Sequence, residues 1–117
     1  MKIVGLEEFL KLPEDTVFMK YKPCAFEELC AKMKTLPHDF ALCTLTTEVD
    51  SVSSDDMFNR LDEALEIGGS VKMDFHSNMR DGCFEKDQLF AIYEKEDVQG
   101  LINRLIECFV NGYPHKV

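Results

Sequence analysis

The clearest hydrophobic pattern in this chain lies near its C-terminal end. Apolar residues recur there every three or four positions, at Val98, Leu101, Ile102, Leu105, Ile106 and Phe109. This spacing places them on one face of an α-helix. Glu96 and Asp97 fall in the first turn, where the helix dipole favours negative charge, and Asn111-Gly112 ends the helix. We expect this face to pack on the core, with Leu105 fully buried.

Shorter apolar segments predict β-strands. Residues 16–21, 40–49 and 88–93 are rich in aromatic, β-branched and aliphatic side chains. Residues 71–75 alternate apolar with polar side chains, which is typical of a strand with one buried face. Residues 24–36 have helical apolar spacing but are bounded by prolines, so either a strand or a helix fits them.

Two further helices are predicted upstream. A short N-terminal helix around Phe9 is stopped by Pro13, and a second helix has Ser54 as its N-cap and ends at Gly68-Gly69. A turn is predicted at Arg80-Asp81-Gly82. We expect the apolar residues of the second helix to face the core, and these are Phe58, Leu61 and Leu65.

The chain of 117 residues is expected to form a single globular domain, residues 1–117. The elements follow the order helix, strand, undecided segment, strand, helix, strand, strand, helix. This order predicts an α+β fold: a small, mostly antiparallel sheet of four or five strands, with about three helices packed on it.

The net negative charge of the chain disfavours partners that are themselves negatively charged. The chain has 22 acidic and 13 basic residues, a net charge of −9. Such a surface repels nucleic-acid phosphates and anionic lipids, so we expect no direct binding to nucleic acid or to a membrane. The five cysteines are an odd set without a CxxC pair, which indicates reduced thiols and no disulfide. We therefore predict a cytoplasmic protein.

The negative charge is concentrated between residues 48 and 66, where seven acidic residues and one basic residue give −6. On the predicted second helix, the acids form an outward-facing row made of Asp55, Asp56, Asp62, Glu63 and Glu66. A solvated helix face is the simpler interpretation. The functional interpretation is a docking face for a protein with a basic surface.

No catalytic or cofactor motif is present. The sequence lacks a glycine-rich phosphate loop, a GxSxG or HExxH pattern and a calcium loop, so we predict no catalytic residue, no cofactor and no metal. Cys83 is the thiol closest to a turn, but Asp81, Glu85 and Asp87 surround it in sequence and disfavour a thiolate. An enzyme built on a carboxylate or on Cys83 is therefore only an alternative.

Two segments resemble small uncharacterised proteins encoded by tailed phages and prophages. They are LEEFLKLPEDTVFMKYKPC at residues 6–24 and RDGCFEKDQLFAIYEKEDVQGLINRL at residues 80–105. In those relatives the segment after the first Pro-Cys carries glycines and forms a strand, so the resemblance favours an extended conformation for residues 24–36. Glu27, Glu28 and Met33 depart from that pattern and keep the helix alternative open. The resemblance implies a phage-related origin, in the host cell cytoplasm, and transfers no functional residue.

The leading hypothesis is a non-enzymatic acidic binding protein of phage or prophage origin that engages a host, defence or phage protein. One alternative is a small enzyme with a carboxylate or Cys83-centred site. The other is a phage assembly accessory that acts by self-association. The sequence leaves the oligomeric state open.

Overall fold

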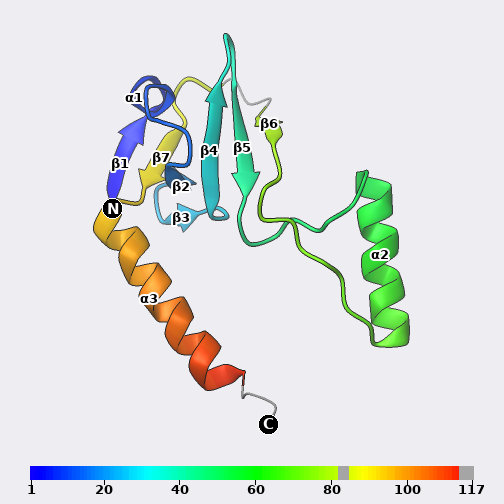
Figure 1. Cartoon of the computed structure of the whole chain (residues 1–117). Coiled ribbons are helices and arrows are strands. Elements are labelled where there is room, and N and C mark those ends of the chain that lie inside the picture. Colours follow the sequence, from blue (N-terminus) through cyan, green and yellow to red (C-terminus); the bar gives the residue numbers. More distant parts are fainter. Residues whose placement is uncertain (82–84, 114–117) are drawn as a thin grey trace.

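Seven β-strands form one antiparallel sheet in the computed structural model of this protein, which describes residues 1–81 and 85–113. Figure 1 shows the sheet, whose strands lie in the order β1-β7-β2-β4-β5-β6, with β3 paired to β2 outside this path. The strands are β1 (Lys2–Gly5), β2 (Val17–Lys22), β3 (Ala25–Phe26), β4 (Cys30–Thr35), β5 (Phe40–Thr44), β6 (Met79–Asp81) and β7 (Leu89–Ile92). The helices are α1 (Leu6–Leu10), α2 (Ser54–Ile67) and α3 (Lys95–Gly112). The α+β class is confirmed, with a larger sheet than the four or five strands expected.

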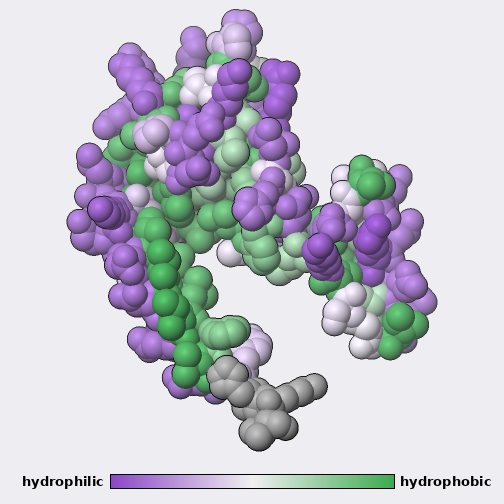
Figure 2. Space-filling model, in the orientation of Figure 1, coloured by the Kyte–Doolittle hydropathy of each residue, from purple (hydrophilic) through white to green (hydrophobic). Residues whose placement is uncertain are grey.

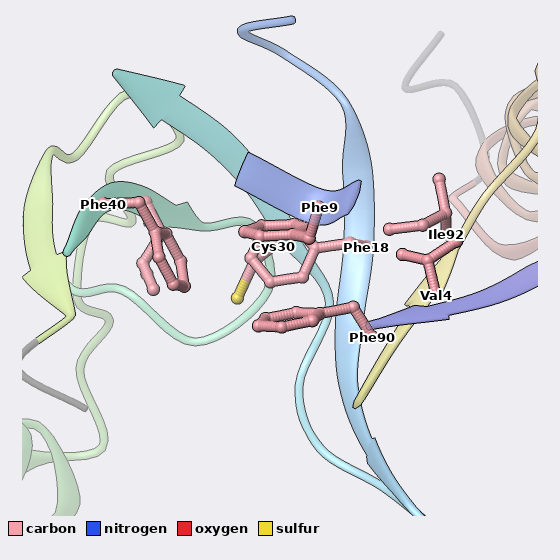
Figure 3. Close-up of a cluster of buried hydrophobic side chains, with 8 residues drawn as sticks. Val4, Phe9, Phe18, Cys30, Phe40, Phe90 and Ile92 are labelled. Carbon is pink, nitrogen blue, oxygen red and sulfur yellow. The ribbon is translucent and has the colours of Figure 1, made fainter. Parts of the chain in front are cut away.

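A cluster of phenylalanines joins α1 to one face of the sheet (Figure 3). Phe9 of α1 stacks on Phe90 of β7, with ring centroids 3.9 Å apart and an interplanar angle of 5°. Phe18 and Phe40 meet the Phe9 ring edge-on, at centroid distances of 4.7 Å and 4.9 Å. Phe9 is 0% exposed, so the short helix that the sequence predicted closes this face of the sheet.

Most predicted strands are present, with shifted ends. Residues 16–21 and 88–93 correspond to β2 and β7, and residues 24–36 contain β3 and β4, so the extended interpretation of that segment is confirmed. Only the first half of residues 40–49 forms a strand, β5. The sequence analysis missed β1, because Lys2–Gly5 is too short to show a pattern and is fixed by antiparallel pairing with β7.

Two predictions are wrong: the strand at residues 71–75 and the turn at Arg80-Asp81. Residues 71–75 form no strand with a buried face: Met73 makes one isolated bridge with Val49, and Phe75 is exposed. Arg80 and Asp81, expected in a turn, belong to β6 and pair with β5. Because β4 and β6 already occupy both edges of β5, no pairing position there remains for residues 71–75. Gly82 lies outside the described residues.

Helix α2 sits at the end of a short arm made of two chain segments that backbone hydrogen bonds join, which we define as residues 45–53 and 69–78. The Asp50 N–H donates to the Lys72 carbonyl at 2.8 Å, and the Asp74 N–H donates to the Glu48 carbonyl at 3.0 Å. Ser53, one residue before the predicted N-cap, caps the helix by accepting the Asp56 N–H at 3.1 Å. Gly68 ends the helix with a φ of 66°, a conformation that glycine adopts without strain.

Neither α2 nor α3 packs on the sheet. No residue of either helix is buried, and Figure 1 shows both helices projecting away from the strands. Leu105, expected to be fully buried, is 57% exposed, and Phe58 and Leu65, expected in the core, are 59% and 83% exposed. Leu61 is exposed as well. These predictions are wrong because helical periodicity identifies an apolar face without identifying the surface that covers it.

The position of Phe9 predicts a large difference between two phenylalanine truncations. Phe9→Ala should lower the free energy of unfolding by about 3–5 kcal/mol, because it leaves a cavity among three other rings. Phe58→Ala, at an exposed position of α2, should change it by only about 0.5 kcal/mol. Denaturant titration followed by tyrosine fluorescence measures both, and equal losses in the two variants would contradict this account of the core.

Candidate functional site

The predicted acidic row lies on the solvent side of α2. Asp55, Asp62, Glu63 and Glu66 are exposed, and none of the four forms an ion pair within residues 1–81 and 85–113. A helical repeat of about 100° per residue brings Asp55, Asp62 and Glu66 within about 40° of one another. These three carboxylates therefore form one line along the helix, free to meet a basic surface.

Asp56, the remaining member of the row, holds α2 together instead. Its carboxylate accepts the Val52 N–H at 3.0 Å and the Arg60 Nε–H at 2.9 Å. The Val52 hydrogen bond, followed by the Arg60 guanidinium, holds the pKa of Asp56 below its usual value. Asp56 thus acts within the helix, and it is the member of the row least available to a partner.

An apolar, uncovered face of α2 lies about 60–120° around the helix from the line of carboxylates. Phe58, Leu61 and Leu65 lie there, all exposed. A different side of the C-terminal half of α2 faces a groove of about 370 Å³, whose lining is mixed and includes Arg60, Glu63, Ala64, Ile67, Val71 and Lys72. Helix α2 therefore presents a line of charge and, next to it, an unburied apolar surface.

Helix α3 carries a longer apolar surface. The α3 stripe, defined by Val98, Leu101, Ile102, Leu105, Ile106 and Phe109, runs nearly the length of the helix. Figure 2 shows hydrophobic side chains following one another along α3. The sequence predicted these residues correctly as one helical face, but it gave no signal that the face would be open.

A small polar cleft lies beside the phenylalanine cluster. Its volume is about 190 Å³, and its polar lining includes Lys20, Glu27, Glu28, Cys30, Thr44 and Asp81. Within the cleft, Lys20 and Asp81 form an ion pair, with 2.6 Å between the Lys20 Nζ and the Asp81 Oδ2. The cleft is smaller than the roughly 300 Å³ at which ordinary ligand sites begin.

The thiol in this cleft is held in its unreactive form. Burial, helped by the nearby Glu28 carboxylate, raises the pKa of Cys30 to about 12. A nucleophilic cysteine needs the opposite shift, because the thiolate is the attacking species. Cys83, the thiol that the sequence singled out, lies outside the described residues. The described part of the cleft therefore gives no support to a thiol-based enzyme.

Metal sites and membrane-spanning helices are the two other features that bear on function. Within residues 1–81 and 85–113, no group of three or more His, Cys, Asp or Glu side chains could hold a metal ion. A membrane-spanning helix is not found in the same part of the chain.

Comparisons with protein-family models, with curated proteins and with solved structures each found no match.

The burial of the cysteines predicts two classes of thiol reactivity. Cys24 and Cys108 are exposed, whereas Cys30 and Cys43 are buried. Brief iodoacetamide treatment of the folded protein at pH 8, followed by mass spectrometry, should modify Cys24 and Cys108 and spare Cys30 and Cys43. Modification of Cys30 as fast as Cys108 would show that the cleft is open.

The raised pKa of Cys30 also predicts a loss of stability in alkali. Above the ordinary thiol pKa of 9.0, the unfolded chain releases a proton that folded Cys30 retains up to about pH 12. The free energy of unfolding should therefore fall as pH rises above 9. Denaturant titrations at pH 8 and pH 10 measure this fall, which should be smaller in Cys30→Ala.

Proposed function

We propose that this chain is a non-enzymatic binding protein that engages another protein through α2. The observation that carries the proposal is the placement of α2 on its arm, with an exposed line of carboxylates and an uncovered apolar face beside it. A helix that contributes nothing to the core of its own domain needs another reason to keep an apolar face.

The chemistry of α2 defines the partner. Five acidic residues and one arginine give the helix a net charge of −4. A basic surface on the partner steers the approach, and an apolar groove receives Phe58, Leu61 and Leu65, as in other complexes of amphipathic helices. Charge thus controls mainly the rate of association, and the apolar face controls how long the complex lasts.

We also propose a phage or prophage origin and a host, defence or phage protein as the partner. The support is the resemblance of residues 6–24 and 80–105 to proteins encoded by tailed phages. Those segments contain α1, β2 and β7, which supply Phe9, Phe18 and Phe90 to the core. Helix α2 lies outside both segments, as expected for a surface that differs between relatives.

Charge reversal on α2 tests the proposal. The triple variant Asp55→Lys, Asp62→Lys and Glu66→Lys changes the charge by +6. Its folding should be almost intact, because exposed charges contribute about 0–1 kcal/mol each. Affinity capture from host lysate at low and high salt, with mass spectrometry, should identify a partner held by the natural protein and lost by the variant. Association of the purified partner should slow sharply and lose most of its salt dependence.

A matched variant separates the position of the charges from their number. Glu14, Glu85 and Asp87 are exposed acids away from α2, and their replacement by lysine gives the same +6 change. This control should capture the same partner at close to the natural rate. Equal losses in the two triple variants, or capture that survives the α2 reversal at every salt concentration, would reject α2 as the docking face.

A further inference from the structure

One copy of this chain exposes more surface than its size requires. Its accessible surface is 8756 Å², whereas a compact 13.5 kDa protein exposes about 6,500 Å². Its radius of gyration is 16.7 Å, against about 13 Å for a compact domain of this length. The excess is roughly 2,000 Å² per copy, more than the ~800 Å² that each partner buries in a standard interface.

The α3 stripe is shaped to cover a broad surface. At about 100° per residue, Leu101 on one border and Ile106 on the other lie about 140° apart around the helix. A pair of helices in a coiled coil buries a narrower seam, whereas a stripe of this width is typical of a helix on a layer such as a sheet. The occupant of the stripe is therefore a layer of apolar side chains.

The sheet offers such a layer on the face opposite the phenylalanine cluster. Since side chains alternate along a strand, Phe18 and Phe90 point into the cluster while Met19 and Ala91 point to the second face. Strand register aligns Ile3, Ala91 and Met19 in one row across β1, β7 and β2. Ile3 is 47% exposed and Met19 is only partly buried, whereas Ala91 between them is 0% exposed, so the larger side chains on either side form the accessible part of this row. Helix α1 lies on the cluster side, and neither α2 nor α3 buries a residue.

The charges around the stripe permit two copies to meet. Helix α3 has a net charge of −1, from Lys95, Arg104, Glu96, Asp97 and Glu107, against −4 for α2. The two positions next to the borders of the stripe, Gln99 and Cys108, are uncharged, and Asp97 lies about 20° beyond Cys108. Arg104 and Glu107 lie away from the stripe and pair with each other at 3.2 Å. A second copy can therefore approach the stripe without a charged side chain directly at either of its borders.

We propose that two copies of this chain form a homodimer in which each α3 stripe packs on the second sheet face of the other copy. A two-fold axis makes the arrangement self-consistent, because both copies give a helix and receive one. The exchange covers the exposed part of the α3 stripe and the exposed side chains of the second sheet face, such as Ile3. It also provides α3 with the tertiary packing on which helices in water depend.

Light scattering coupled to gel filtration tests the dimer with the full chain. The natural protein should have twice the chain mass of 13.5 kDa at micromolar concentration. Leu105→Glu, within the stripe, and Ile3→Glu, on the sheet face, should each give a monomer. Asn111→Glu adds the same charge on the opposite side of α3 and should remain a dimer.

The thiol of Cys30 reports whether each variant keeps its core, because protection from alkylation requires the folded sheet. If Leu105→Glu loses this protection, Leu105→Ala takes its place, and the dimer dissociation constant must rise about tenfold or more. A monomeric natural protein overturns the proposal and leaves the stripe to a different protein. A dimeric Leu105→Glu removes α3 from the interface, and a dimeric Ile3→Glu removes the sheet face, so either result overturns it. The α2 triple reversal should remain a dimer, which keeps this test separate from that of the proposed function.

Discussion

The rest of the structure depends on the contact between Phe9 and the rings around it. Four of the nine phenylalanines gather there, and α1, which is only five residues long, is fixed to the sheet mainly through Phe9, with Leu6 and Leu10 packed beside it. A cluster of this size covers one side of the sheet and no more. The open sheet face, the α3 stripe and the apolar side of α2 follow from that concentration of the core, which leaves other apolar side chains to serve as surface.

The sequence predicted what depends on local chemistry. Ser53 and Gly68 bound a 14-residue helix whose ends differ little from those expected, and the apolar residues of α3 do share one face. Contacts between residues far apart in the sequence could not be predicted from the sequence pattern. Leu105 has the spacing of a core residue whether it faces its own sheet or another chain, and Lys2–Gly5 becomes a strand only because β7 lies beside it. The acidic row on α2 was found from its charge, whereas the exposure of the stripe had no counterpart in the pattern.

Helices that do not pack on the rest of the protein lose the tertiary contacts from which most helical stability comes. Isolated helices of about 12–15 residues are marginal in water, and local caps contribute only about 1 kcal/mol each. The end contacts of α2, from Ser53 and Asp56, set where the helix starts but cannot by themselves hold it. In a complex formed through either helix, part of the interaction energy would be used to order that helix.

The arm that carries α2 leaves the sheet between two paired strands, apart from the residues of the aromatic core. Strands β5 and β6 pair directly, with Leu42 opposite Met79, so the two ends of residues 45–78 leave the sheet one strand spacing apart. The entropy of closing such a segment grows only slowly with its length, by about 0.6 kcal/mol per doubling. Lineages could lengthen, shorten or replace the arm while the aromatic core stays the same. Helix α2 could therefore be altered without a change in the residues that pack around Phe9.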